Sequence, residues 1–280
     1  MKDRSFSLSG KNGHGVLLIH GLTGAPGEMK YLARKLNRAG FAINCPQLAG
    51  HGADLKTLLT TTWADWLDSL HQGVEALRKE NDTISVAGIC VGGALGLLLT
   101  EHHPDIAAAA VYSMTFYYDG WNMKRWYVAS AHLLWHVADL PLLRSLSFSE
   151  PYPFGLKDEK LREAAAKPGA NLIPGALDRL PMGSMYQMHR LGAHLERMGP
   201  RLSTPTLILH AQEDDMSDPR NAFRLRDALG GPTHVRLLKD SYHMIHVDKE
   251  RDLVADLTGD FFANPRRFTD VPLTGELRHA

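Results

Sequence analysis

The stretch "SVAGICVGGALG", residues 85–96, decides the fold of this 280-residue chain. An apolar, strand-like run ends here at Gly88, and glycine recurs at Gly92 and Gly93 around one reactive side chain, Cys90. Small residues at these offsets predict a strand that turns sharply into a helix, because larger side chains would collide with neighbouring backbone. The start of that helix offers free N–H groups and the positive end of its dipole, which favour a thiolate. We therefore predict a nucleophilic Cys90; a buried structural cysteine is the alternative.

Apolar runs typical of buried strands alternate with segments of helical spacing on both sides of this turn. The expected strands cover residues 15–20, 41–46, 83–88, 106–112, 206–211 and 233–238. The expected helices cover residues 28–39, 63–79, 91–103, 219–229 and 248–262. Because strands joined by helices run parallel, the pattern predicts an α/β fold with a mostly parallel sheet covered on both faces.

The alternation is interrupted over residues 114–200, which contain helical, aromatic and proline-rich pieces without a clear strand. We predict a core made of residues 1–113 and 201–280, with a mostly helical lid inserted at 114–200. The tail that begins at Asn264 is expected to be irregular.

Aromatic side chains gather in this insertion. Because the lid should cover the site, we expect some of them to line an apolar acyl pocket, with a role in the lid's own core as the alternative. The predicted substrate-binding residues are Trp121, Trp126, Tyr127 and Trp135.

The composition excludes several classes of protein. The 31 basic and 31 acidic residues balance, so no charge surplus favours nucleic acid or an anionic membrane. No apolar run approaches the roughly 18 residues of a membrane span. The polar start of the chain lacks the apolar centre of a secretory signal, and Cys45 and Cys90 are too few for a disulfide framework. We predict a cytoplasmic protein with free thiols.

The first strand ends in "HGLTG", residues 20–24. Glycine-flanked backbone at this place can direct the N–H of Leu22 at a developing oxyanion, with the N–H of Val91 as the second donor. A plain turn is the alternative. His20 is expected to shape the loop rather than to transfer protons.

An acid and a base are expected after the last two strands. "QEDDMSDP" follows the strand at 206–211 and offers Asp214, Asp215 and Asp218 as candidate acids; we predict Asp214, which comes soon after that strand. "KDSYHMIHVD" follows the strand at 233–238, and its first histidine, His243, is the predicted base.

The other polar residues of these two loops are expected to stay outside the chemistry. Asp218 is expected to cap the helix that begins near residue 219, and His246 to pack at the start of the final helix. Glu213 and Asp215 are expected to be solvated loop charges.

The order of turn, acid and histidine on an interrupted α/β pattern resembles the α/β-hydrolase superfamily. Within it, the chain resembles small bacterial carboxylesterases and monoglyceride-lipase-like enzymes. The matching stretches are "VLLIHGLTGAPGEM", "AGHG", the turn around Cys90, "HAQEDDMSDP" and "DSYHMIHVDKERD", which together run from about residue 15 to 260.

The resemblance implies the α/β-hydrolase fold and assigns the same site residues. It places Cys90, Asp214 and His243 in the nucleophile, acid and base positions, and Leu22 and Val91 in the oxyanion loop and turn. The esterases carry serine where this chain has Cys90. Cysteine at that place is similar to dienelactone hydrolases and polyhydroxyalkanoate synthases.

Three functions remain open from the sequence. The leading hypothesis is an acyl hydrolase that cleaves an ester, thioester, lactone or amide with an apolar acyl chain through a thioester intermediate, without a cofactor or metal. An acyltransferase would use the same intermediate with an alcohol, amine or thiol acceptor. A non-catalytic binder is the third. His132 and His136 have a spacing that can bind metal, but no third ligand is evident.

Overall fold

The computed structural model describes residues 2–124, 140–167, 169–170 and 172–269. Within these residues, seven strands form one sheet in the order β1-β3-β2-β4-β5-β8-β9. Their bounds are β1 Phe6–Leu8, β2 His14–Ile19, β3 Ala42–Cys45, β4 Thr83–Ile89, β5 Ile106–Tyr112, β8 Thr206–Ala211 and β9 Thr233–Leu238. Only β1 pairs antiparallel with its neighbour, so the predicted mostly parallel sheet is confirmed. The three-residue edge strand β1 is too short for the sequence pattern to detect.

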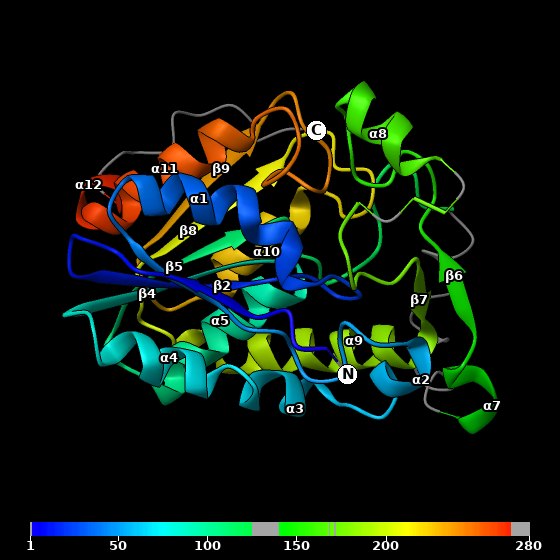
Figure 1. The fold of residues 1–280 in the computed structure, drawn as a ribbon, viewed down its shortest axis with the longest axis horizontal. Coiled ribbons are helices and arrows are strands. Elements are labelled where there is room, and N and C mark those ends of the chain that lie inside the picture. Colours follow the sequence, from blue (N-terminus) through cyan, green and yellow to red (C-terminus); the bar gives the residue numbers. More distant parts are fainter. Residues whose placement is uncertain (1, 125–139, 168, 171, 270–280) are drawn as a thin grey trace.

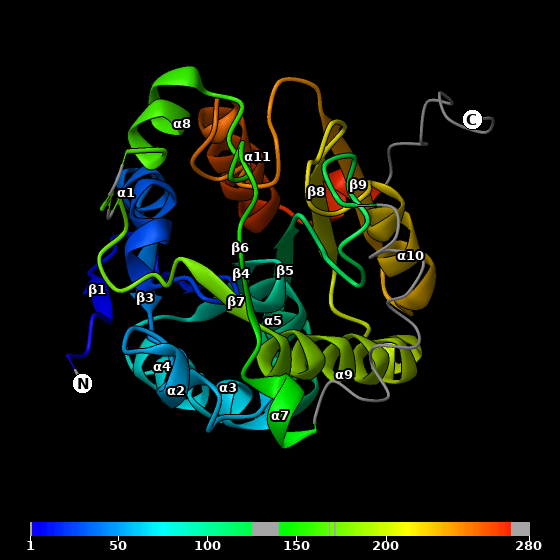
Figure 2. The same ribbon diagram turned by 90° about the vertical axis from the view of Figure 1, so that its right-hand side faces the viewer.

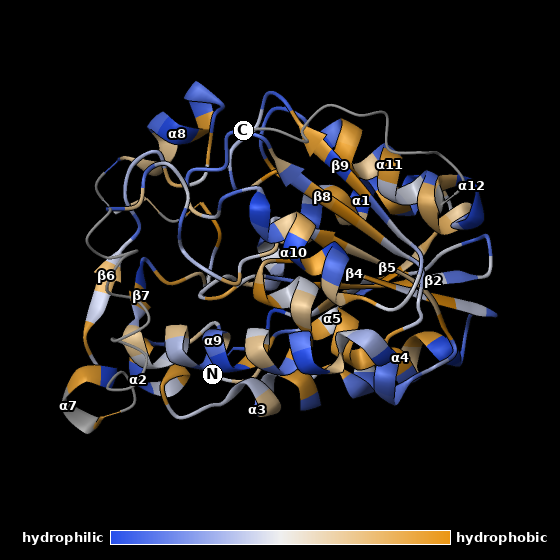
Figure 3. Cartoon of the chain, turned by 180° about the vertical axis from the view of Figure 1, so that it is seen from behind, coloured by the Kyte–Doolittle hydropathy of each residue, from blue (hydrophilic) through white to orange (hydrophobic). Residues whose placement is uncertain are grey.

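Helices cover both faces of the sheet (Figures 1 and 2). On one face, α1 (Lys30–Arg38) packs against α11 (Arg251–Ala263). The helices of the other face are α3 (Trp63–Asp68), α4 (His71–Arg78), α5 (Val91–His102), α9 (Met182–Met198) and α10 (Arg220–Ala228). Hydrophobic residues concentrate in the strands between these layers, as Figure 3 shows. The core therefore lies where the doubly covered sheet predicts it.

Four short helices differ from the sequence prediction or add to it. The helix expected at 63–79 is two helices, α3 and α4, because the chain turns at Ser69 and Leu70. Helix α2 (Leu55–Leu58) precedes them, and α12 (Arg266–Thr269) lies in the tail that was expected to be irregular. No helix in the described part of the chain is long and apolar enough to cross a membrane.

The described residues between β5 and β8 are not mainly helical before α9. They form α7 (Pro141–Arg144), α8 (Glu159–Ala165), the 3-10 helix η2 (Gly199–Arg201) after α9, and an antiparallel pair of strands, β6 (Ser147–Ser149) and β7 (Arg179–Pro181). The expectation of no strand here was wrong, since three-residue strands give no periodic signal. Helix α9 packs on α5 and α3, whereas α7, α8, β6 and β7 stand at one end of the sheet (Figure 1). The division of the chain into core and lid stays a prediction.

Candidate active site

Cys90 occupies a sharp turn between β4 and α5, as the sequence predicts. Its backbone has φ 52° and ψ −115°, a conformation that side-chain-bearing residues rarely adopt. A Cβ on Gly88 would lie 2.3 Å from the carbonyl carbon of Gly92, and a Cβ on Gly92 would lie 2.3 Å from the oxygen of Ile19. Both glycines are therefore required by close approach of the backbone, which holds the thiol at the carboxyl end of β4.

Asp214 and His243 form the hydrogen bond that the sequence predicts between acid and base. The Nδ1–H of His243 donates to the Asp214 carboxylate, at 2.9 Å from Oδ2 and 3.1 Å from Oδ1. Oδ1 also accepts the backbone N–H groups of Met216 and Ser217, at 2.9 and 2.8 Å. Burial opposes ionisation of Asp214, but the charge of His243 and hydrogen bonds from His210 and His243 hold its pKa below the ordinary value.

The imidazole of His243 links this carboxylate to the thiol. Burial lowers its pKa, but the Asp214 charge and hydrogen bonds to Asp214 and Cys90 outweigh burial and hold the pKa of His243 well above its ordinary value. The structure thus brings Cys90, His243 and Asp214 together, with His243 hydrogen-bonded to Asp214 and interacting electrostatically with Cys90, an arrangement suited to nucleophilic catalysis. Their catalytic roles stay a prediction.

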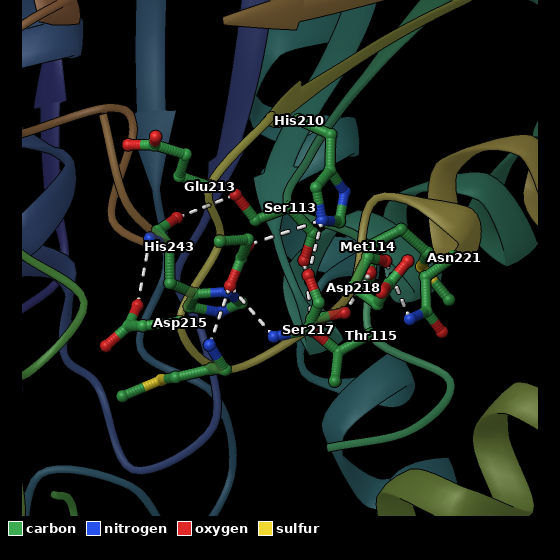
Figure 4. A network of polar contacts seen from close by, with 12 residues as sticks. Ser113, Met114, Thr115, His210, Glu213, Asp215, Ser217, Asp218, Asn221 and His243 are labelled. Carbon is green, nitrogen blue, oxygen red and sulfur yellow. Dashed lines mark hydrogen bonds and ion pairs between the residues drawn. The ribbon is translucent and has the colours of Figure 1, made fainter. Parts of the chain in front are cut away.

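Asp215 is not the solvated loop charge that was expected; it is completely buried. One carboxylate oxygen accepts the backbone N–H of His243 at 3.3 Å (Figure 4), and the other accepts that of Gly155 at 3.0 Å. The carbonyl of His243 accepts the Ser113 hydroxyl at 2.6 Å. Burial and the neighbouring Asp214 charge raise the pKa of Asp215. The expectation failed because adjacent residues of an irregular loop can both face inward, which no periodicity reveals.

The other two acidic residues of this loop lie as expected. The Glu213 side chain is 57% exposed and pairs with Lys157 at 2.5 Å. Asp218 accepts the backbone N–H of Arg220 at 2.8 Å, at the first residue of α10. Among the described residues, neither Glu213 nor Asp218 makes a hydrogen bond to the thiol or to His243. Glu213 therefore acts as a surface charge and Asp218 as a partner of the helix start.

A second histidine, His210, contacts the acid and was missed by the sequence analysis. It is fully buried at the end of β8, with Nε2 3.3 Å from Oδ2 of Asp214 and 2.9 Å from the carbonyl oxygen of Ser217 (Figure 4). Its Nδ1 has no hydrogen-bond partner among the described residues. In the sequence, His210 is one polar residue in an apolar strand and gives no signal of this contact.

The two predicted oxyanion donors flank the thiol. Leu22 is the second residue of a turn closed by a hydrogen bond from Gly24 N–H to Gly21 O, at 3.2 Å. Its own N–H has no acceptor in the part of the chain that the structure describes. Val91 is the first residue of α5, a position whose N–H has no acceptor within the helix. Two unpaired donors near one nucleophile suit an oxyanion, but that role stays a prediction.

His20 and His246 are buried and stand apart from the proton path. His20 donates from Nδ1 to Gly21 O at 2.9 Å and accepts the Leu48 N–H on Nε2 at 3.1 Å, so it shapes the loop as predicted. Neither ring nitrogen of His246 has a partner among the described residues. Burial and the nearby His243 lower the pKa of His246 to about 3.

A cavity of about 360 Å³ opens at the thiol and has Cys90, His243 and Leu22 in its wall. The insertion contributes a large apolar part of the wall: Phe154, Leu156, Leu161, Leu172, Ile173, Leu177 and Leu180. Two carboxyl groups, Glu28 and Glu150, also line it, and no lysine or arginine does among the described residues. Burial raises the pKa of each to about 7. The sequence analysis assigned neither glutamate a role.

The predicted aromatic wall is not formed by Trp121. This side chain is 58% exposed, and its indole N–H donates to the carbonyl of Glu213 at 3.0 Å, away from the cavity wall. Of the insertion's aromatic residues, Tyr118 does line the cavity. Three other predicted substrate-binding residues lie outside the described residues: Trp126, Tyr127 and Trp135.

The residues that the structure describes contain no candidate metal site. His132 and His136, the one pair with suggestive spacing, lie outside the described residues. Across residues 2–124, 140–167, 169–170 and 172–269, no three or more His, Cys, Asp or Glu side chains gather as metal ligands would. Both cysteines, Cys45 and Cys90, are free and buried.

Comparison with known proteins gives consistent matches over most of the chain. A family model described as serine aminopeptidase, S33, matches residues 11–250. The chain is 29% identical over 250 residues to the thermostable monoacylglycerol lipase of Bacillus sp. strain H-257, covering 89% of this chain and 90% of that protein. It is 24% identical over 243 residues to a carboxylesterase of Bacillus subtilis strain 168, covering 85% and 88%.

A solved structure shows the same fold. It is that of the metagenome-derived lipolytic enzymes LipS and LipT, which matches with a TM-score of 0.76 at 22% identity over 92% of this chain and 96% of that chain. The chain therefore has the α/β-hydrolase fold that the resemblance implied. This fold carries the mostly parallel sheet, the turn at Cys90 and the acid and base beside it.

Proposed function

Because this chain belongs to the serine aminopeptidase S33 family of α/β-hydrolases, we propose that it is an acyl-ester hydrolase with Cys90 as its nucleophile. The observation that carries the proposal is that Cys90 and His243 share the wall of a largely apolar cavity, with His243 hydrogen-bonded to the buried Asp214 carboxylate. Serine aminopeptidases are named for a serine, so cysteine at the turn is the distinctive feature of this member.

Acylation begins when His243 accepts the proton of the Cys90 thiol and the sulfur attacks the carbonyl carbon of the ester. Asp214 holds the ring with Nδ1–H toward the carboxylate, which leaves the other nitrogen to receive that proton. The N–H groups of Leu22 and Val91 stabilise the oxyanion of the tetrahedral intermediate. The carbon–oxygen bond then breaks, His243 gives its proton to the leaving alkoxide, and a thioester remains on Cys90.

Deacylation repeats the steps with water. His243 takes a proton from water, hydroxide adds to the thioester carbonyl, and the same two N–H groups stabilise the oxyanion. The carbon–sulfur bond breaks, the acid leaves, and the proton returns from His243 to the Cys90 sulfur. The two steps together consume one ester and one water and return Cys90 and His243 to their starting protonation.

The cavity wall indicates the substrate class. The apolar insertion residues suit a hydrocarbon acyl chain, because apolar surface is favourably removed from water. Glu28 and Glu150 can accept hydrogen bonds, and without a facing lysine or arginine among the described wall residues they disfavour an anionic leaving group. A neutral, hydroxyl-bearing alcohol fits both conditions. Monoacylglycerol, which the Bacillus relative is named for cleaving, is the proposed test substrate.

A second candidate is acyl transfer, and Cys90 itself favours it. A thioester keeps more reactivity toward an alcohol, amine or thiol than the oxyester that a serine would form. In that case an acceptor replaces water in the second step, with the same residues in the same roles.

Intact-mass measurement after mixing the protein with monoacylglycerol, simple esters and acyl thioesters tests these alternatives. Hydrolysis predicts an adduct of one acyl group on Cys90 that water clears, and transfer predicts faster clearance by an added alcohol or amine. Cys90→Ala should form no adduct. Binding of monoacylglycerol with neither adduct nor product would overturn the enzyme proposal in favour of a binder.

A further inference from the structure

Glu28 lies inside the loop that presents Leu22. It belongs to the 3-10 helix η1 (Pro26–Met29) and is 5% exposed. Its Oε1 accepts the backbone N–H of Gly21 at 2.7 Å, and the Ala25 backbone also lowers the pKa of the carboxyl group. The carboxyl group therefore holds the first amide of the loop at residues 21–25.

The loop is built around this carboxyl group. A Cβ placed on Gly24 would lie 2.2 Å from Oε2 of Glu28, so only glycine leaves room for the carboxyl there. Thr23 has φ 61°, a left-handed conformation that costs free energy and persists only where the surroundings enforce it. Its carbonyl accepts the N–H of Leu177 at 2.8 Å, which ties the outside of the loop to the insertion.

This geometry determines where the N–H of Leu22 points. In a turn closed from Gly24 N–H to Gly21 O, the N–H of the second residue is not used by the turn. The amide of Gly21 is fixed by Glu28, and its carbonyl is fixed by the His20 ring at 2.9 Å. Since both ends of that residue are held, the peptide that carries the Leu22 N–H has little freedom to rotate.

Keeping a carboxyl group in this place costs free energy. Burial raises the pKa of Glu28 to about 7, and the nearby Glu150 raises it further, while the Gly21 N–H acts in the opposite direction. An apolar side chain of similar size would avoid that cost but could not accept the amide hydrogen of Gly21. The acceptor function is therefore what the side chain provides.

We propose that Glu28 is a positioning residue of the oxyanion hole, which holds the loop at 21–25 so that the Leu22 N–H faces the acyl oxygen. The proposal rests on the proposed function in one respect, namely that the Leu22 N–H stabilises an oxyanion. Glu28 contacts neither the substrate's reacting atoms nor the thiol in this role.

Glu28→Ala and Glu28→Gln test the proposal in the full-length protein, with Glu150→Gln as the matched control. Removing one oxyanion donor outright costs about 10²–10³ in kcat, so a displaced donor in Glu28→Ala should lower kcat by roughly 10- to 100-fold. The change in kcat carries the test rather than KM, because Glu28 also lines the cavity that the substrate enters. Glu28→Gln keeps one acceptor oxygen and should fall between Glu28→Ala and wild type.

A trifluoromethyl ketone with a hydrocarbon chain, whose adduct places an oxyanion in the hole, provides a second measurement. Its affinity should fall in proportion to kcat/KM across the Glu28 variants, as expected for a transition-state mimic. In Glu150→Gln the ketone affinity should stay within about twofold of wild type, with any change appearing in KM for monoacylglycerol.

Amide hydrogen exchange of Gly21, followed by NMR, tests the loop without any activity. This amide should exchange at least about tenfold faster in the Glu28 variants and at the wild-type rate in Glu150→Gln. Unchanged exchange at Gly21 overturns the proposal, as does faster exchange with unchanged kcat. If Glu28→Ala unfolds, Glu28→Gln decides. A wild-type protein that cleaves no ester overturns the proposed function, and with it the oxyanion role, whereas the exchange rates still report whether Glu28 holds the loop.

Discussion

The carboxylate of Asp215 accepts the backbone N–H of His243, while the adjacent Asp214 accepts the ring N–H of the same histidine. Two consecutive side chains of one loop thus hold the main chain and the imidazole of a single residue. The Asp215 contact also reaches Gly155 of the insertion, at 3.0 Å. The position of His243 therefore depends on the loop after β8 and on the segment that supplies part of the cavity wall.

Asp214→Asn and Asp215→Asn should separate these two tasks. An amide at position 214 can hold the imidazole in the wrong tautomer, so we expect kcat to fall by about 10³- to 10⁴-fold with little change in Tm. An amide at position 215 loses an acceptor for one of two backbone N–H groups, so we expect roughly a tenfold loss of kcat and a lower Tm. Steady-state kinetics and calorimetry check both. A larger kcat loss in Asp215→Asn at wild-type Tm would reverse the assignment of the acid.

The parts of the site that follow regular elements could be predicted from the sequence. Cys90 and Asp214 come directly after apolar strands, and His243 after the next one, so the parallel sheet itself brings them to one edge. The glycines at 88 and 92 indicate the turn in the sequence, because any larger residue there would collide with neighbouring backbone.

The contacts that could not be predicted come from irregular segments and single polar residues. Asp215 and Glu28 are buried because their irregular loops turn these side chains inward. An irregular loop has no sequence periodicity from which that orientation could be predicted. His210 looks like any strand residue until Asp214 folds back beside it. Trp121 was chosen for its type, but an aromatic residue in an insertion can equally lie on the surface, where it is found.

The two thiols should differ in reactivity. Cys45 is fully buried, and burial together with the Glu28 charge raises its pKa well above the ordinary value. Cys90 lies in the cavity wall together with His243, whose pKa its side chain raises. Iodoacetamide at pH 7 should label Cys90 at least about 100-fold faster than Cys45, because the thiolate is the reactive form. Peptide mass spectrometry measures both rates. Equal labelling in the folded protein would contradict an activated nucleophile; in denaturant the two should become similar.

Acid should destabilise the fold through buried histidines, and His246 provides the clearest test. Its folded pKa is about 3 against about 6.5 in the unfolded chain, because burial and His243 disfavour the charged form. Below pH 6.5 the unfolded state therefore binds a proton that the folded state does not, and the free energy of unfolding falls as the pH falls. Between pH 6.5 and 5 this amounts to roughly 2 kcal/mol for one histidine.

His246→Leu removes that contribution, so its free energy of unfolding should fall less than that of wild type between pH 7.5 and 5. Urea unfolding at the two pH values measures the difference. His14, His20 and His51 have pKa values lowered by burial in the same way, so the variant should remain acid-sensitive to a smaller degree. An identical fall in both proteins would show that His246 carries a proton in the folded state at pH 5.

Cys90→Ser addresses the departure from the serine of related esterases. The turn and the two N–H donors belong to the backbone, and the glycines that permit them are unchanged by the substitution. A hydroxyl is much less acidic than a thiol, so attack would depend more strongly on His243 as general base. Cys90→Ser should therefore retain measurable hydrolysis of activated esters, whereas Cys90→Ala should have none.

Transfer should respond differently from hydrolysis in the same variant. An oxyester on the substituted serine would give up its acyl group to an alcohol or amine less readily than the thioester on Cys90. If the native reaction is transfer, Cys90→Ser should lose several-fold more transfer than hydrolysis when both products are quantified from one incubation with monoacylglycerol and a competing acceptor. Equal losses would remove the reason to regard the cysteine as a device for transfer, and full native activity in Cys90→Ala would show that the nucleophile lies elsewhere.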